Sequence, residues 1–233
     1  MNPLIRSFLF GAVVLMTPVA YSAETSLPAS LLAGVSDADL SAGLKSGLGS
    51  ALESAMSKLT QPGALKVSPP PALAKIEAAA EGAGQAGAAG DLSSSVSAAV
   101  AKIAPQAADL MKSAFKDVKI ADAKAALLNA PGGGTQYFKK AMTPALHDKL
   151  LPLVKEAVAS AGVADKAKSL LASAGSLASL AGVKSLGDID TYVCDQVINQ
   201  SFKLMAKEEA AIRANPSLLT NPLAEKVFSL IKK

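Results

Sequence analysis

The densest group of residues that could do chemistry lies near the C-terminus, where Glu208, Glu209 and Arg213 follow one another closely. Glu209 and Arg213 are four positions apart, so on a helix they share a face and can form an ion pair. One interpretation is a solvated helix face. The alternative is that a carboxylate and Arg213 turn inward and form a buried network with Tyr137 or Tyr192, either structural or ligand-binding.

Histidine and cysteine each occur once, as His147 and Cys194. A zinc site needs three or four ligands, so the sequence predicts no metal site. Zincin, nucleophile-elbow and P-loop motifs are also absent, and we predict no cofactor. We interpret Cys194 as a buried structural thiol and His147 as a partly exposed surface residue rather than a general base. The glycosylation sequon at Asn199 lies within a predicted helix, and we interpret it as chance.

Three consecutive glycines at 132–134 precede the segment that begins with Thr135. Backbone N–H groups exposed by glycines at a helix start can bind an anion. No strand is predicted before these glycines, so the phosphate-loop context is missing. We therefore favour a flexible connection over an anion site.

The composition favours a helical protein. The chain has 233 residues, of which 50% are hydrophobic, only 4% are aromatic and none is tryptophan. About a fifth of them are alanine, the strongest helix former, and the residues that build large sheets are sparse. The formal net charge is +4, but no basic run exceeds two residues. This distribution argues against nucleic-acid binding, and we predict an all-α fold.

Apolar residues spaced three and four apart predict a single domain of about eight to ten helices over residues 36–233. Proline and glycine divide this domain into segments. The predicted helices cover 36–59, 72–81, 91–118 with a break or kink at Pro105, 120–129, a short helix after 135, 144–161 with a bend at Pro152, short pieces over 163–186, 189–214, and a last one from 222.

Helix starts are marked by residues that can accept hydrogen bonds from backbone N–H groups. Ser36 and Asp39 have capping-box spacing, and the other predicted N-caps are Asp91, Thr143, Asp188 and Asn221. Thr143 and Asn221 are each followed by proline, which is favoured at the first helical position.

The first predicted helix carries one apolar stripe of leucines, and two glycines, Gly43 and Gly47, lie on another line of the same helix. Glycine is costly inside a helix, so we expect a partner helix to approach closely there. The residues predicted to be buried across the domain are Leu40, Leu44, Leu48, Leu52, Val100, Phe115, Phe138, Val193, Phe202 and Ile212.

Residues 1–22 have the pattern of a secretory signal peptide. A positive start is followed by an apolar run and by a small-x-small triplet at 20–22, which predicts cleavage before Ala23. The run is short for a hydrocarbon core of about 30 Å, so we expect export to the periplasm or beyond rather than an anchor. No cysteine stands near the cleavage point, which argues against a lipoprotein. Residues 23–35 are predicted to be a flexible leader, and no transmembrane segment is expected in the mature chain.

Several stretches together resemble a bacterial exported family known only as domain of unknown function 4197. The resemblance spans about 40–230, and its most specific parts are TQYF at 135–138 and EEAAIRANP at 208–216. The chain departs from the family pattern at Lys139, where arginine is expected, and over 159–187, which is rich in Ala, Ser and Gly. The other matching stretches are 43–45, 51–52, 69–71, 121–124, 127–128 and 188–193. The resemblance implies an exported single-domain protein and supplies no activity.

The two most family-like stretches are also places where polar residues interrupt apolar patterns. We therefore hypothesise that Tyr137, Glu209 and Arg213 meet and fix the segment that begins with Thr135 against the long C-terminal helix. A buried tyrosine ring leaves a hydroxyl that needs a partner, and an arginine can pair with a carboxylate one turn back and still reach a carbonyl.

Three functions from different classes fit these observations. The first is a non-catalytic binding or interaction protein with a site for an apolar ligand or a protein partner between its helices. The second is a peripheral membrane-surface protein that uses a short helix such as 163–183. The third is a hydrolase that uses carboxylates alone, with Glu208, Glu209 and Asp190 as candidates. The sequence favours the first.

Overall fold

The computed structural model describes residues 34–82, 84, 86–120, 122–128, 132–174 and 188–231. The predicted signal peptide, almost all of the predicted leader and the pieces predicted after residue 174 lie outside this part of the chain. Within it the secondary structure is helical, without strands, which confirms the all-α prediction. The elements are α1 (Asp37–Leu59), α2 (Pro71–Gly82), α3 (Ala86–Asp117), α4 (Ala123–Leu128), α5 (Gly133–Ser160), α6 (Val163–Ala174), α8 (Asp188–Ala214), the 3₁₀ turn η2 (Pro216–Leu218) and α9 (Pro222–Leu230).

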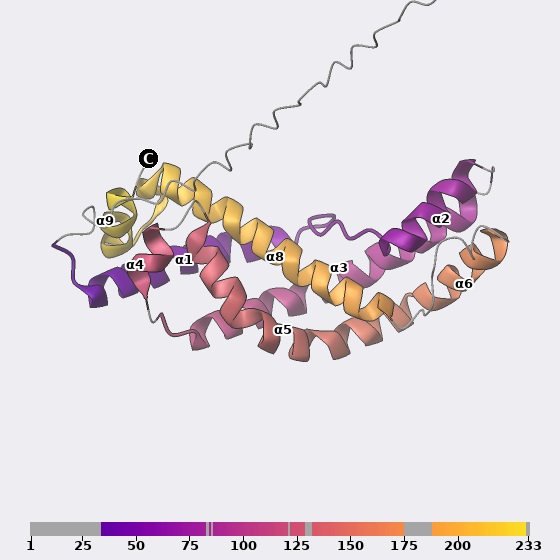
Figure 1. Ribbon diagram of the computed structural model, residues 1–233, viewed down its shortest axis with the longest axis horizontal. Helices are drawn as coiled ribbons and strands as arrows, with labels where there is room; N and C mark the ends of the chain where they lie inside the picture. Colours follow the sequence, from indigo (N-terminus) through magenta and orange to yellow (C-terminus); the bar gives the residue numbers. More distant parts are fainter. Residues whose placement is uncertain are drawn as a thin grey trace, which may run out of the picture.

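The long helices α3, α5 and α8 pack against one another, and α1 packs against α3, α8 and α9 (Figure 1). The short helices gather at the two ends of this arrangement. At one end, α2 and α6 pack against α3 and against each other, and at the other end, α4 and α9 pack against α1 (Figure 1). We call these the α2/α6 end and the α4/α9 end.

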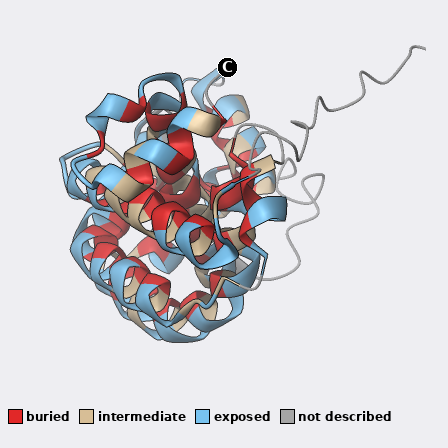
Figure 2. Ribbon diagram, turned by 90° about the vertical axis from the view of Figure 1, so that its left-hand side faces the viewer, coloured by how far each residue is buried: buried red, intermediate tan, exposed pale blue. Residues whose placement is uncertain are grey.

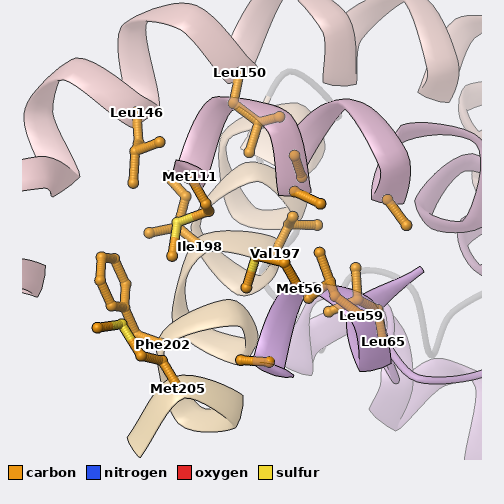
Figure 3. Packing of buried hydrophobic residues seen from close by; sticks show 14 of the residues in the cluster. Met56, Leu59, Leu65, Met111, Leu146, Leu150, Val197, Ile198, Phe202 and Met205 are labelled. Atoms are coloured by element: carbon orange, nitrogen blue, oxygen red, sulfur yellow. The ribbon is translucent and has the colours of Figure 1, made fainter. Parts of the chain in front are cut away.

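The core forms where the apolar stripes of the long helices meet. Buried residues lie on the inward faces and exposed residues on the outward faces (Figure 2). Side chains from α1, α3, α5 and α8, including Met56, Met111, Leu150 and Phe202, point toward one another in the middle of the molecule (Figure 3). All ten residues predicted to be buried are buried, which confirms the assignment of the helix faces.

Local signals in the sequence set several helix starts. Ser36 caps α1, and its Oγ accepts from the Asp39 N–H at 3.1 Å and donates to the Asp39 carboxylate at 2.8 Å. Asn221 caps α9, and its Oδ1 accepts from the N–H groups of Leu223 and Ala224. Both caps are as predicted, because each depends only on residues within one turn.

Gly43 and Gly47 lie in α1 against α9. A Cβ atom at Gly43 would stand 2.5 Å from Val227 Cγ2, and one at Gly47 would stand 2.4 Å from Phe228 Cε2. Real Cβ atoms do not approach other atoms so closely, so only glycine fits at this helix crossing. The predicted close approach is confirmed, and the partner is the last helix of the chain.

The predicted start of the third helix is wrong, and of the two alternatives predicted at Pro105, a break or a kink, the break is wrong. Helix α3 starts at Ala86 instead of Asp91 and continues through Pro105. A proline inside a helix removes one hydrogen bond and costs about 3 kcal/mol. Ile103 and Ala107, on either side of Pro105, are buried in the core, and this burial offsets the cost.

Helix α5 is likewise one helix and not two, because it runs through both Pro144 and Pro152. Thr143, predicted as an N-cap, instead donates through its Oγ1 to the Lys139 carbonyl at 2.7 Å, one turn back along the same helix. Packing of α5 against both α3 and α8 holds its whole length helical.

Candidate functional site

The carboxylate of Glu209 binds the N-terminus of α5. Glu209 comes from α8 and is fully buried. Its Oε2 accepts from the Thr135 N–H at 2.7 Å, and its Oε1 accepts from the Gly134 N–H at 3.3 Å. The first N–H groups of a helix lack partners within the helix and carry a partial positive charge. Glu209 therefore serves as an internal anion for α5.

Arg213 completes this contact from one turn further along α8. Its Nε donates to Glu209 Oε1 at 2.8 Å, and its Nη1 donates to the Leu127 carbonyl at the end of α4 at 3.1 Å. The guanidinium also lies over the ring of Phe228 in α9, 6.0 Å from its centre. We call Glu209, Arg213, the N–H groups of Gly134 and Thr135, and the Leu127 carbonyl the polar node. It joins α4, α5 and α8, and Phe228 of α9 packs on it.

The glycines before Thr135 have a specific role at the polar node. Gly132 has a φ of +93°, a conformation that side chains rarely adopt. A Cβ at Gly134 would lie 2.7 Å from Leu48 Cδ1 and 3.2 Å from Glu209 Oε1. The preferred interpretation of a flexible connection at 132–134 is thus wrong for the described glycines. They start a helix on an anion, and the anion is a side chain of the same protein.

Glu208 points to a different set of partners from those of its neighbour Glu209. The Ser54 hydroxyl donates to its Oε2 at 2.7 Å, and Lys58 donates to its Oε1, both from α1. Burial by itself raises the pKa of the Glu208 carboxyl. The hydrogen bonds from Lys58 and Ser54 and the lysine charge outweigh burial and hold the pKa below its ordinary value. Glu208 therefore links α8 to α1.

Tyr137 contributes to a third link. Its hydroxyl donates to the Lys119 carbonyl, after the end of α3, at 3.0 Å, and its ring meets the edge of the Phe138 ring. Of the three residues hypothesised to meet, the structure brings Glu209 and Arg213 together, and the acceptor described for the Tyr137 hydroxyl is Lys119. Tyr192, the alternative partner, lies 21 residues before Arg213 on α8, or about 30 Å along the helix axis.

The carboxylates do not form a catalytic pair. Asp190 and Glu209 lie on the same helix, 19 residues and about 28 Å apart along its axis. Glycoside hydrolysis needs two carboxyl groups within about 10 Å. Glu209 is also fully buried with its oxygens occupied. The geometry therefore contradicts the hypothesis of a hydrolase that pairs Glu208 or Glu209 with Asp190.

The single histidine and cysteine are placed as expected from the sequence. His147 is partly exposed, with Nε2 3.8 Å from Asp195 Oδ1. Cys194 is fully buried. Burial, assisted by the negative charge of Asp195, raises the pKa of its thiol to about 12. A thiol with that pKa stays protonated at neutral pH and is a poor nucleophile.

A separate hollow lies between the α1–α2 connection and α3. It has a volume of about 690 Å³, within the range of small-molecule sites. We call it the α3 groove. Its α3 wall consists mostly of Ser and Ala residues, which are too small to fill the space. Its lining residues are Leu59, Thr60, Gln61, Pro62, Gly63, Leu65, Lys66, Val67, Ser68, Ser93, Ser97, Ala98, Val100, Ala101 and Ala104.

The α1–α2 connection is held as a wall of this groove. Leu65 and Val67 are buried while Lys66 between them is exposed, so the side chains alternate as in an extended chain. Gln200 of α8 donates to the Lys66 carbonyl at 3.3 Å. The three prolines at 69–71 stiffen the exit toward α2.

Ser93, on the α3 wall, also binds a buried carboxyl group. Its hydroxyl lies 2.9 and 3.1 Å from the two carboxyl oxygens of Glu77 in α2, and Glu77 is only 8% exposed. Burial raises the pKa of Glu77, and the nearby Glu81 adds to the rise, against a lowering effect of the Ser93 hydrogen bonds.

Comparison with protein families identifies the chain. The model of the family described as protein of unknown function (DUF4197) matches residues 34–229. The chain belongs to the DUF4197 family. The match covers the helices described above except for the last residue of α9, so the polar node and the α3 groove both lie within the family domain. No curated protein and no solved structure matches this DUF4197 protein significantly.

The described residues offer neither a membrane span nor a metal site. None of the helices described is long and apolar enough to cross a membrane. In the same part of the chain, no three His, Cys, Asp or Glu side chains are grouped so that they could hold a metal ion.

Sequence reasoning missed the α3 groove and the buried Glu77. The groove arises because a connection folds back on α3, and no local pattern encodes that path. Glu77 falls on the same face as Leu73 and Ile76 of α2, one position after an apolar residue. A charged residue on an otherwise apolar face was the available signal.

Proposed function

We propose that this DUF4197 protein is an exported, non-catalytic binding protein. Its ligand is a small molecule with an apolar body and an acidic head group, bound in the α3 groove. The observation that carries the proposal is the groove itself, a space of about 690 Å³ between the α1–α2 connection and α3.

The chemistry of the lining supports this class of ligand. Leu65, Val67 and Val100 offer apolar surface, and Ser93 and Ser97 offer hydroxyl groups. Lys66 is the charged residue of the lining, which favours an anionic head group over a cationic one. A fatty acid combines these features.

Export is supported by the signal-peptide pattern over 1–22, which sequencing of the mature N-terminus would test. We expect mature protein from the periplasm to begin at Ala23 or Glu24. A mature chain that still carries Met1 would contradict export by cleavage.

A peripheral membrane role is less well supported. The apolar residues of α6, Val163, Ala167, Leu170 and Ala174, are buried in the fold, where α6 packs against α2 and α3. This face of α6 is therefore occupied within the protein and is not free to lie on a lipid surface.

The test of the proposed ligand is binding of palmitate and of its uncharged alcohol analogue, hexadecanol, by calorimetry. We expect Ala101→Phe, which fills the groove, to abolish binding of both, and Ala159→Phe, on an exposed position of α5, to leave both unchanged. Lys66→Gln should weaken palmitate about tenfold and spare the alcohol. Equal binding by wild type and Ala101→Phe would contradict the proposal, as would no binding of either compound.

A further inference from the structure

A second, smaller hollow lies between α5 and α8, on the side of α5 that carries Lys139. It has a volume of about 180 Å³ and lies at the start of α5, close to the polar node. Helix α5 contributes Thr135, Gln136 and Lys139 to its lining, and α8 contributes Asn199 and Lys203. We call it the α5/α8 hollow.

The charges around this hollow are of one sign. Lys139 and Lys203 approach it from different helices, and no acidic residue is part of its lining. Neither lysine forms an ion pair with any residue that the structure describes. Glu209, the carboxylate at the N-terminus of α5, is buried and paired with Arg213, so it does not neutralise the two lysines.

The polar groups of the hollow complement these charges. Gln136 and Asn199 carry amide N–H groups that can donate to oxygen. Thr135 is 3% exposed, and its Oγ1 is buried without a hydrogen-bond partner. Buried hydroxyl groups are nearly always paired, so an unpaired one in the wall of a hollow indicates a missing partner.

We propose that the α5/α8 hollow binds a small oxyanion of the phosphate type. Two lysine ammonium groups supply the charge, the amides of Gln136 and Asn199 donate hydrogen bonds, and an anion oxygen accepts from the Thr135 hydroxyl. The site is separate from the α3 groove, and the proposal does not depend on the ligand of that groove.

The anion can be free phosphate or the phosphate of a lipid head group, and the experiment separates the two. Calorimetry measures binding of inorganic phosphate to the mature protein. Flotation measures binding to phosphatidylcholine vesicles with and without phosphatidylglycerol. Saturable binding of inorganic phosphate identifies the free anion. Binding to phosphatidylglycerol vesicles that excess phosphate displaces identifies a lipid head group.

Variants tie either signal to the hollow. We expect Lys139→Gln and Lys203→Gln each to weaken binding about tenfold, and Lys139→Arg to retain it. Lys112→Gln, which removes an exposed lysine of α3, is the matched control and should bind as wild type does. Thr135→Val should weaken binding several-fold at an unchanged melting temperature, which shows that the fold is intact.

Two results would overturn the proposal. One is the absence of saturable binding by the wild type to both phosphate and phosphatidylglycerol vesicles. The other is an equal affinity of wild type and the double variant Lys139→Gln/Lys203→Gln.

Discussion

At the α4/α9 end, side chains of α9 lie directly against the α1 backbone and a charged pair is buried, whereas toward the α2/α6 end the α1–α2 connection leaves a groove along α3 and α2 buries a carboxyl group without a cation. Gly43 and Gly47 let α9 lie directly on α1. The carboxylate of Glu209 has two amides and Arg213 as partners. At the opposite end, Glu77 has a hydroxyl, that of Ser93.

The difference shows two uses of small residues in an alanine-rich helical protein. Glycines on one line of a helix allow a partner so close that no space remains. Alanines and serines on the α3 wall, facing a connection instead of a helix, leave space that a ligand can enter. A buried charge is stable at the first kind of contact because its partners are fixed. A buried charge is less stable where small residues face a connection and leave space.

The largest expected effect is at the polar node. Arg213→Ala should lower the free energy of unfolding by about 3–5 kcal/mol, because it leaves the buried Glu209 carboxylate without its cation. Urea unfolding measures this change. A loss below about 1 kcal/mol would mean that the polar node does not stabilise the α4/α9 end.

The next largest effects are expected from core substitutions, which should lower the free energy of unfolding by different amounts in the two regions. Leu48→Ala, beside Gly134, should cost about 2–5 kcal/mol, because the closely packed surroundings cannot fill the cavity. Val67→Ala, in the wall of the α3 groove, should cost less than about 1.5 kcal/mol, because the space beside it is already open. Similar losses in the two variants would remove the proposed difference in packing.

The glycine contact is tested within one helix. Gly47→Ala should cost about 1–3 kcal/mol, because its Cβ would overlap Phe228. Gly49→Ala places its Cβ at an ordinary 3.5 Å from Phe115, and it should stabilise α1 by up to about 1 kcal/mol. Changes of the same sign in both variants would contradict the close approach of α9.

The smallest effect is the pH dependence contributed by Glu77. Its pKa is raised in the folded protein, so the folded state binds the proton more tightly than the unfolded state. This contribution to stability is complete below the ordinary pKa of 4.5 and is lost as the pH rises through the folded value. Glu77→Gln should therefore raise stability at pH 7 by less than about 1 kcal/mol and flatten the pH profile above 4.5.

The matched control for that profile is Glu53→Gln, which removes an exposed carboxylate of α1 and should leave the slope unchanged. Glu208→Gln should change it in the opposite sense. The pKa of Glu208 is lowered, so its contribution is present above pH 4.5 and is lost as the pH falls. Parallel profiles for wild type and Glu77→Gln would show that Glu77 is not strained by burial.

The parts of the fold predicted from the sequence are those that depend on neighbouring residues. The leucine stripe of α1 and the caps at Ser36 and Asn221 each involve residues within one or two turns. The break considered at Pro105 and the helix start predicted at Thr143 and Pro144 are wrong, because packing of α3 and α5 in the core outweighs the local cost of proline. The sequence shows where proline destabilises a helix, but only the tertiary structure shows that packing in the core offsets that destabilisation.

The candidate site divides in the same way. The pairing of Glu209 with Arg213 follows from their spacing on one helix. The glycine run at 132–134 suggested an anion site only as the less favoured alternative to a flexible connection. What could not be predicted is that these two features belong together, because 74 positions separate Thr135 from Glu209. The hollows form only where separate segments meet in the fold, and they left no pattern in the sequence.

The polar node also constrains the order in which the protein can fold. A chain that emerges N-terminus first presents the glycines of α1 and the start of α5 long before Glu209, Arg213 and Phe228 appear. Until then, α5 lacks its anion and α1 lacks the helix that covers Gly47. Contacts of such wide separation in the sequence form late and slow the folding of a domain. Completion of the α4/α9 end therefore waits for α8 and α9, and this end stays open until both helices are in place.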